Sequence, residues 1–314
     1  MSADSPRHLL SIADLGRDEI ASIISSAASF EAIGEREIKK VPTLRGRTVV
    51  NLFYESSTRT RVSFELAAKR LSADVINVSA DASSVRKGES LRDTARTLRA
   101  LGADAIVLRH PAAGAPAMLA RLTDARVINA GDGAHEHPTQ ALLDMYTVQS
   151  RFGSLEGLRI GIVGDIVHSR VARSNALGFR RMGADVVLIA PPTLLPHKVS
   201  ALGSRWSHDL DAELPSLDVV YLLRMQRERH REPLIPSERE FTQGFGLTRD
   251  RLARMAPDAV VMHPGPMNRG VEIDWEAAES EVALIEAQVS AGVAVRMALM
   301  YLLLGGQPLV EVAS

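Results

Sequence analysis

The sequence predicts an α/β protein with two doubly wound, Rossmann-like parallel sheets that are joined by helices. Short apolar, β-branched runs alternate with stretches rich in helix formers, which is typical of parallel sheets. This alternation starts again after Gly157, and a chain of 314 residues exceeds what one core usually supports. We therefore expect one domain from residues 1–143 with 290–314, and a second from residues 144–289.

The first domain is expected to begin with helix over residues 9–40, capped by Ser11 or Asp14, because isoleucines recur on one face. Pro42 ends that stretch. Strands are then expected at residues 48–54, 74–78, 105–108 and 126–129, and helices at 62–71, 91–101 and 115–122. A helix over residues 139–151 is expected to lead into the second domain, since no flexible linker separates the two.

In the second domain, strands are expected at residues 158–163, 184–189, 218–223 and 259–262. Residues 227–246 are long, charged and expected to be irregular. Such a segment is either a flap that closes on a ligand or a plain solvated loop. Residues 279–304 predict a long amphipathic helix or a pair of helices.

The composition limits the kinds of partner. With 46% hydrophobic and 24% charged residues the chain is an ordinary globular protein, and its net charge of -1 argues against a nucleic-acid or membrane-surface partner. The absence of cysteine excludes disulfides, zinc–thiolate sites and a thiol nucleophile. Residues 1–8 lack the pattern of a signal peptide, and no apolar run is expected to reach the length of a membrane span. We expect a cytoplasmic protein.

A pentapeptide, Ser57-Thr-Arg-Thr-Arg61, stands between a predicted strand and a predicted helix. The first N–H groups of a helix have no partner inside it. Hydroxyls and arginines at that point therefore suit an anion, and phosphate in particular. The alternative is an ordinary capped helix with two solvated arginines.

Cationic and neutral donor side chains follow most of the predicted strands, with hardly any carboxylate among them. Besides the pentapeptide they are Arg109, His110, His137, Gln140, Arg170, Arg224, Gln226 and His263. In open α/β sheets ligands bind beyond the carboxyl ends of the strands. The sequence therefore predicts a site for a multiply anionic substrate.

Other kinds of site find little support. The chain has no paired-carboxylate spacing, no Gly-x-Ser-x-Gly elbow and no Walker A motif. Residues 161–165 resemble a dinucleotide-binding loop but lack its third glycine, which favours a tight βα turn. His135 and His137 could form a metal pair, but without a third ligand nearby a hydrogen-bonding role is favoured. We expect neither a metal nor an organic cofactor.

Taken together, these segments resemble the aspartate/ornithine carbamoyltransferase family over essentially the whole chain. The resemblance is carried by residues 57–61, 87–90 (Lys-Gly-Glu-Ser), 109–111 (Arg-His-Pro), 137–140 (His-Pro-Thr-Gln), 164–170, 224–226 and 263–266 (His-Pro-Gly-Pro). Lys-Gly-Glu and the His-Pro-x-Pro turn favour aspartate over ornithine as the acceptor. The ornithine enzymes typically carry a cysteine-containing turn there, and this chain has no cysteine.

The resemblance implies transfer of the carbamoyl group of carbamoyl phosphate to L-aspartate, the committed step of pyrimidine biosynthesis. It implies a carbamoyl-phosphate-binding first domain and an aspartate-binding second domain. It also implies a homotrimer with active sites shared between subunits. Assembly with regulatory or dihydroorotase chains stays open.

The resemblance also assigns roles to residues. Carbamoyl phosphate is expected to contact Ser57, Thr58, Arg59, Thr60, Arg109, His137 and Gln140, together with Ser83 and Lys87 from a neighbouring subunit. Thr60, Arg109 and His137 are expected to bind the carbonyl oxygen, with Arg59 as a further catalytic residue. Aspartate is expected to contact Lys87, Arg170, Arg224, Gln226 and the carbonyls of Pro264 and Gly265. Gly265 stands where relatives often have a larger apolar residue.

Each role has a plainer alternative: a solvated strand-end arginine for Arg109 or Arg224, a structural histidine for His137, and a solvated loop residue for Lys87. For the whole chain, the alternatives are a carbamoyltransferase with another amino acceptor, a non-catalytic anion-binding protein and, more remotely, a nicotinamide dehydrogenase.

Overall fold

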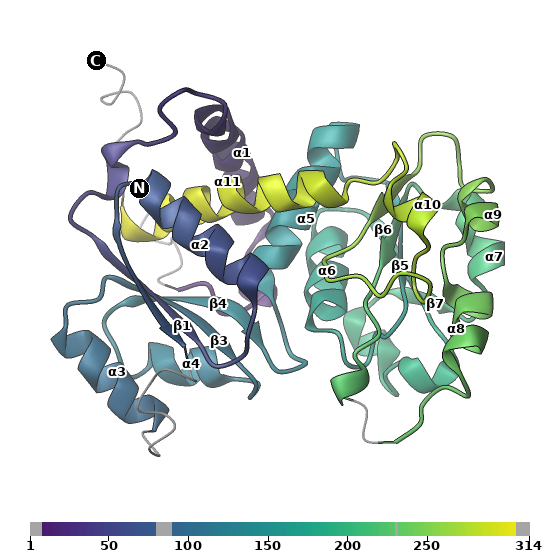
Figure 1. Cartoon of the computed structure of the whole chain (residues 1–314), viewed down its shortest axis with the longest axis horizontal. Coiled ribbons are helices and arrows are strands. Elements are labelled where there is room, and N and C mark those ends of the chain that lie inside the picture. The colour runs from purple at the N-terminus through teal and green to yellow at the C-terminus, as the bar shows by residue number, and fades with distance from the viewer. Residues whose placement is uncertain (1–7, 80–89, 230–231, 306–314) are drawn as a thin grey trace. The chain divides into compact units, whose positions relative to one another are not determined.

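The computed structural model describes residues 8–79, 90–229 and 232–305. These residues belong to two compact units, the first from residues 1–146 with 290–314 and the second from residues 147–289. Each unit has one parallel sheet with helices on its faces (Figure 1). The predicted fold class, two α/β units with doubly wound parallel sheets, is confirmed.

The first unit contains a sheet in the order β2-β1-β3-β4. Its strands are β1 (Thr48–Phe53), β2 (Asp74–Ser79), β3 (Ala105–His110) and β4 (Arg126–Asp132). Its helices are α1 (Arg17–Gly34), α2 (Thr58–Arg70), α3 (Leu91–Ala100), α4 (Ala115–Ala120), most of α5 (Pro138–Phe152) and most of α11 (Ile285–Leu304), with short 3₁₀ turns at Ile12–Asp14 and Pro42–Leu44.

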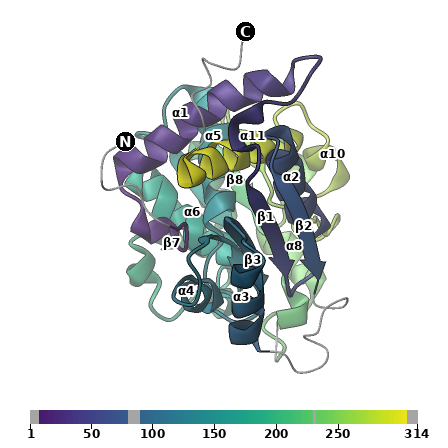
Figure 2. The ribbon, with the colours of Figure 1, turned by 90° about the vertical axis from the view of Figure 1, so that its left-hand side faces the viewer.

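Helices α3 and α4 cover one face of this sheet, where Ala95, Leu98 and Leu119 pack on alternate residues of β1, β3 and β4. Helices α1, α2 and α11 lie on the other face (Figures 1 and 2). Strands β1, β3 and β4 are buried on both faces along most of their length, which explains why they read as continuous apolar runs, whereas the edge strand β2 is half-buried or exposed.

The expected helix over residues 9–40 is wrong in extent. Ser11 caps only a 3₁₀ turn, and Leu9 pairs with β4 through an N–H that donates to the Val127 carbonyl at 2.9 Å. Helix α1 ends at Gly34. Residues 35–40 that follow are all exposed, and all of them except Ile38 are charged, so no buried apolar face holds them in a helix.

The second unit contains a sheet in the order β7-β6-β5-β8-β9. Its strands are β5 (Arg159–Val163), β6 (Asp185–Ile189), β7 (Arg205–Ser207), β8 (Val219–Leu222) and β9 (Val260–Met262). Its helices are α6 (Arg170–Arg181), α7 (Leu210–Glu213), α8 (Glu238–Phe245), α9 (Arg249–Leu252) and α10 (Trp275–Ala278), with 3₁₀ turns at Pro192–Leu194, Val199–Leu202, Leu214–Ser216 and Arg227–Arg229.

Several features of this unit differ from expectation. Strand β7 is missed because its residues are largely exposed and few. Residues 227–246 are not irregular throughout: they contain a 3₁₀ turn and helix α8, whose cap Ser237 accepts a hydrogen bond from the Glu240 N–H. Whether this segment acts as a flap stays a prediction.

Helix α11 also corrects the sequence analysis. It is buried along much of its length and not amphipathic, with Ala294, Val295 and Met297 all inside. It is the one helix in the described part of the chain that is long and apolar enough to cross a membrane, so the expectation that no apolar run reaches that length is wrong. Of its most apolar window, 61% is buried inside the protein, as in a core helix.

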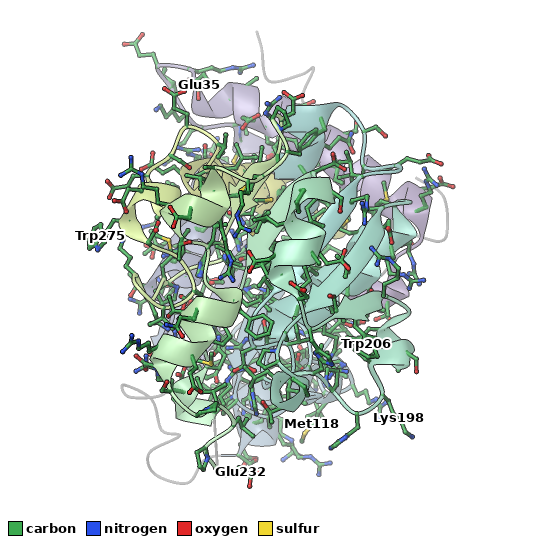
Figure 3. The ribbon with its side chains drawn as sticks, turned by 90° about the vertical axis from the view of Figure 1, so that its right-hand side faces the viewer. Glu35, Met118, Lys198, Trp206, Glu232 and Trp275 are labelled. Atoms are coloured by element: carbon green, nitrogen blue, oxygen red, sulfur yellow. The ribbon has the colours of Figure 1, made fainter. Side chains whose placement is uncertain are left out.

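Both tryptophans lie in the second unit and are exposed (Figure 3). Trp206 is on β7, and Trp275 begins α10. The Arg269 guanidinium lies 4.0 Å from the centroid of the Trp275 ring, a cation–π contact that steadies an otherwise solvated side chain.

Candidate functional site

The first sheet has its topological switch point between β1 and β3. The chain leaves β1 towards β2 on one side and leaves β3 towards β4 on the other. Ligands bind in the crevice that such diverging connections leave at the carboxyl ends of the strands. The pentapeptide follows β1, Arg109 is at the end of β3, and His137 follows β4. The fold therefore brings the predicted residues of this unit to one edge of one sheet.

The pentapeptide forms the start of α2. Ser57 is the N-cap residue, extended at φ -161° and ψ 90°, and its side chain makes no capping hydrogen bond. Thr58 and Arg59 are exposed, whereas Thr60 is buried. The missing capping bond of Ser57 argues against the alternative of an ordinary hydroxyl-capped helix, whereas the exposure of Arg59 is what that alternative expects. What remains is a helix N-terminus lined with hydroxyls, which suits an anion.

Arg109 is held by the strands on both sides of it. It pairs with Phe53 of β1 in the sheet register, and its Nη1 donates to the Ala130 carbonyl of β4 at 3.3 Å. Its Nε lies 3.6 Å from Oε2 of Glu55, in the loop after β1. The expectation that hardly any carboxylate joins these cations is wrong here. Glu55 was missed, although it closely precedes the pentapeptide.

His137 immediately precedes α5, and Gln140 stands on its first turn. His137 is buried, with Nδ1 at 3.4 Å from Oγ1 of Thr139, and its carbonyl accepts from the Gln140 N–H at 2.9 Å. Because the Gln140 N–H binds the His137 carbonyl, the two residues lie next to each other where α5 begins. The Gln140 side chain donates from Nε2 to Oδ1 of Asp144 at 3.0 Å.

His110 is engaged in local structure. Its Nδ1 accepts from the Ala112 N–H at 2.9 Å, and its ring tilts against that of Tyr54 at 4.8 Å between centroids. Burial lowers the pKa of His110, so its neutral form is favoured.

Ser83 and Lys87 lie outside the described residues, and their roles stay predictions.

The second sheet has its switch point between β5 and β8, since β6 and β9 lie on opposite sides of this pair. Arg170 begins α6 after β5, Arg224 and Gln226 follow β8, and the Pro264–Gly265 turn follows β9. All of them lie at the carboxyl edge of neighbouring strands, where a ligand of this unit is expected.

Asp165 ties the loops after β5 and β8 together. This carboxylate is fully buried, and its Oδ1 lies 2.8 Å from Nδ1 of His168. Its Oδ2 accepts from the backbone N–H of Gln226 at 3.2 Å, and Nη1 of Arg229 donates to the His168 carbonyl at 2.7 Å. Asp165 fixes the backbone that carries Gln226. The sequence assigned Asp165 to a tight turn and to the segment 164–170 that carries the family resemblance, but gave it no role of its own.

The two arginines of this unit are held differently. Arg170 is buried, and its neighbour Ser169 caps α6 by accepting from the Ala172 N–H. Arg224 donates from Nη1 and Nη2 to Oε1 of Glu228 at 2.8 and 2.7 Å, and from Nη2 to Oε2 at 2.6 Å. Arg224 thus contacts both oxygens of a carboxylate four residues along the chain, which again contradicts the expectation of a site with hardly any carboxylate.

The turn after β9 is set by His263. Its Nδ1 accepts from the Gly265 N–H at 2.8 Å, and its Nε2 lies 3.4 Å from Oε1 of buried Glu272. Gly265 adopts φ 61°, a conformation that glycine adopts without strain, and the Gly265–Pro266 peptide is cis. The carbonyls of Pro264 and Gly265 therefore stand in a turn whose backbone is held by His263.

A cavity of about 710 Å³ in the first unit is a different place. Its lining includes Arg47, Asp104 and Arg126, which lie at the amino ends of β1, β3 and β4. It is therefore at the opposite edge of the sheet from the pentapeptide.

Across the described ranges, no group of three or more His, Cys, Asp or Glu side chains is placed to hold a metal ion. His135 is exposed, and its Nδ1 lies 3.1 Å from Oδ2 of Asp132.

Comparison with known proteins gives the family. Residues 7–150 match the model described as aspartate/ornithine carbamoyltransferase, carbamoyl-P binding domain, and residues 156–303 match its Asp/Orn binding domain. The chain belongs to the aspartate/ornithine carbamoyltransferase family. It is 61% identical over 300 residues to the aspartate carbamoyltransferase catalytic subunit of Thermobifida fusca, covering 96% of each chain. It is 58% identical over 303 residues to that of Salinispora tropica, covering 96% of this chain and 98% of the other.

Solved structures agree with this assignment. Aspartate transcarbamoylase from Trypanosoma cruzi in complex with carbamoyl phosphate and aspartate has a TM-score of 0.85 and 30% identity, covering 94% of this chain and 95% of that one. Ornithine carbamoyltransferase from Pyrococcus furiosus has a TM-score of 0.86 and 28% identity, covering 96% and 98%. The fold is therefore common to enzymes named for either acceptor, and the choice between acceptors depends on other features.

Proposed function

We propose that this carbamoyltransferase joins the carbamoyl group of carbamoyl phosphate to the α-amine of L-aspartate, giving N-carbamoyl-L-aspartate and phosphate. This is the committed step of pyrimidine biosynthesis. The observation that carries the proposal is the pair of arginines, Arg170 and Arg224, at the second switch point, together with 58–61% identity to catalytic subunits named for aspartate. Aspartate has two carboxylates, which suit two guanidinium groups, whereas ornithine would call for an acidic partner.

The first unit binds carbamoyl phosphate. The N-terminus of α2, with Ser57, Thr58, Arg59 and Thr60, holds the phosphate group, because its N–H groups and hydroxyls donate to phosphate oxygens. Thr60, Arg109 and His137 donate to the carbamoyl oxygen. Donors fixed before the reaction stabilise the negative charge that grows on this oxygen as the amine attacks.

The second unit binds aspartate. Arg170 and Arg224 bind the two carboxylates, and Gln226 assists. The carbonyls of Pro264 and Gly265 accept hydrogen bonds from the amine, and the lone pair of the amine attacks the carbamoyl carbon. A C–N bond forms and the C–O bond to phosphate breaks. The departing phosphate accepts the amine proton, since no side chain stands out as the general base.

The assembly is a homotrimer in the cytoplasm, in which Ser83 and Lys87 of a neighbouring subunit complete each site. Mixing inactive Lys87→Ala and Arg59→Ala chains tests this, because some trimers then contain an intact site. Regained activity after verified subunit exchange supports sharing, and no recovery contradicts it. Whether regulatory or dihydroorotase chains join the trimer can be read from the mass of the assembly isolated from cells.

The reaction itself is tested by phosphate release from carbamoyl phosphate, with aspartate and ornithine as acceptors in parallel. We expect release with aspartate and little with ornithine. Activity with ornithine alone would refute the proposed acceptor, and activity with neither would favour a non-catalytic anion-binding protein.

A further inference from the structure

A buried polar cluster links α2, α5 and α11 in the first unit. Arg296 of α11 is only 3% exposed. Its Nη1 donates to Oγ of Ser63 on α2 at 2.8 Å and to the Gly292 carbonyl at 2.9 Å. Its guanidinium lies 4.9 Å from the ring centroid of Phe64. An arginine buried to this degree needs a compensating charge.

Asp144 supplies that charge. It is fully buried on α5, one turn after Gln140. Burial lowers the pKa of Arg296 to about 10, and the negative charge of Asp144 opposes this shift. Arg296 thus stays ionised at neutral pH. The two opposite charges stabilise each other inside the unit, where either one alone would be costly.

The Asp144 carboxylate determines which way the Gln140 amide faces. A carboxylate only accepts hydrogen bonds, so the amide must turn its NH₂ group towards Asp144, as the 3.0 Å contact from Nε2 shows. Because the amide is planar, its oxygen then points away from Asp144. That oxygen is the atom able to accept a hydrogen bond from an NH₂ group of a ligand.

We propose that Asp144 and Arg296 are positioning residues that keep the Gln140 carbonyl oxygen directed at the NH₂ of the carbamoyl group, and so make the enzyme prefer carbamoyl phosphate to acyl phosphates without an NH₂. This rests on the proposed function. Neither residue touches the substrate: Asp144 orients the amide, and the charge of Arg296 offsets that of Asp144 in the interior.

Asp144→Asn is the informative change because it preserves shape. The Arg296 guanidinium draws the oxygen of the substituted amide towards itself, which turns the NH₂ of that amide towards Gln140. Gln140 then turns its own oxygen inward and offers NH₂ to the substrate NH₂, so that two donors face each other. A lost hydrogen bond with a buried donor left unpaired costs affinity by roughly tenfold.

The measurement compares carbamoyl phosphate with acetyl phosphate, in which a methyl group replaces the NH₂. Acetyl phosphate is used as a competitor, so its own turnover does not matter. The quantity is the ratio of KI for acetyl phosphate to KM for carbamoyl phosphate, with aspartate as acceptor. We expect this ratio to fall roughly tenfold in Asp144→Asn and in Gln140→Ala, with no further fall in the double variant.

Arg126→Met is the matched control. Nε of Arg126 donates to the Leu303 carbonyl at 3.2 Å, so this variant also loosens α11 but leaves Gln140 untouched. We expect a lower melting temperature and an unchanged ratio. If Asp144→Asn does not fold, Asp144→Glu keeps the charge and displaces it by one methylene, and a smaller fall in the ratio is then expected.

The outcomes separate the two proposals. If the unaltered enzyme transfers nothing from carbamoyl phosphate to aspartate, the proposed function fails. If it is active but the ratio is unchanged in folded Asp144→Asn or in Gln140→Ala, the function stands and the positioning role is refuted.

Discussion

The two switch points carry an arginine each at a comparable place, Arg109 at the end of β3 and Arg224 after β8, but they hold it differently. Arg109 is part of a strand and donates to the backbone of β4, with Glu55 only at 3.6 Å. Arg224 stands in a loop, and Glu228 contacts it with both oxygens at 2.6–2.8 Å. The first arginine is thus fixed by the sheet and the second by a carboxylate. In the proposed function Arg109 contacts the carbamoyl oxygen and Arg224 binds a carboxylate of aspartate, so changes at the first switch point should affect the reaction step and changes at the second should affect aspartate binding.

The largest effect is expected from His137→Ala. His137 is buried at the start of α5 and, in the proposed reaction, donates to an oxygen that gains charge only during the transfer. Removing one such donor typically lowers kcat by ~10²–10³. We expect kcat with both substrates saturating to fall by that factor, with KM for aspartate changed little. His135→Ala, two residues away and exposed, is the control and should keep kcat. A large rise in KM for aspartate at constant kcat would contradict the assigned role.

A smaller effect, confined to binding, is expected from Arg170→Met. In the proposed function this removes a guanidinium that binds a carboxylate of aspartate, and such a charge-assisted contact is worth ~1.5–3 kcal/mol. By that energy, KM for aspartate should rise roughly 10- to 100-fold, while KM for carbamoyl phosphate stays the same. Arg181→Met at the far end of α6 tests for a general effect on that helix. Equal rises in both KM values would show that the two switch points are not specialised.

Glu228→Ala tests whether a carboxylate holds Arg224 ready. Arginine has five N–H donors, so Glu228 can hold the guanidinium while others bind aspartate. Without Glu228 the Arg224 side chain is mobile in the free enzyme. Aspartate binding must then order it, and the conformational entropy that is lost weakens binding. We expect KM for aspartate to rise about tenfold in Glu228→Ala. The rise should be smaller in Glu228→Gln, because the glutamine side chain still accepts a hydrogen bond from Arg224. Glu238→Ala, which removes the ion pair with Arg227 in the same segment, is the control. A fall in KM would show instead that Glu228 competes with the substrate.

The same contrast explains what sequence could predict. Strand runs such as Val49–Leu52 are buried on both faces and carry their apolar signal locally, so the sheets and the strand-end positions of Ser57–Thr60, Arg109 and His137 could be predicted. The distant partners could not: Glu55 and Asp165 are ordinary acidic residues in the sequence, and only the fold places them against Arg109 and Gln226. Asp144 and Glu228 stand four residues after Gln140 and Arg224, a spacing at which side chains of a helix meet, and were overlooked. Short exposed strands such as β7 carry no periodic signal at all.

The smallest effect, on stability, is expected at the end of the 227–246 segment, where a carboxylate again holds an arginine. Asp211 binds Arg251 at 2.9 and 2.7 Å, and Arg251 in turn donates to the carbonyls of Thr242, Gln243, Gly244 and Gly246 at the end of α8. Hydrogen bonds from Arg251, followed by those from Arg254, lower the pKa of Asp211 from 3.8 to about 2.

Because the pKa of Asp211 is lower in the folded than in the unfolded chain, its contribution is fully present above pH 3.8 and is lost as the pH falls towards 2. Asp211 is 43% exposed, so solvent screening reduces the effect, and we expect Asp211→Asn to lower the free energy of unfolding by about 1 kcal/mol at pH 7. Urea titrations between pH 3 and pH 7 measure the free energy of unfolding of the unaltered protein and of Asp211→Asn. The difference between the two values should become smaller towards pH 3. Asp258→Asn, exposed in the loop before β9, should leave the curve unchanged. If this difference in the free energy of unfolding stayed constant over the pH range, Asp211 would stabilise the protein through packing and not through its charge. The contrast between the two units would then depend on the carboxylates of Glu228 and Asp165.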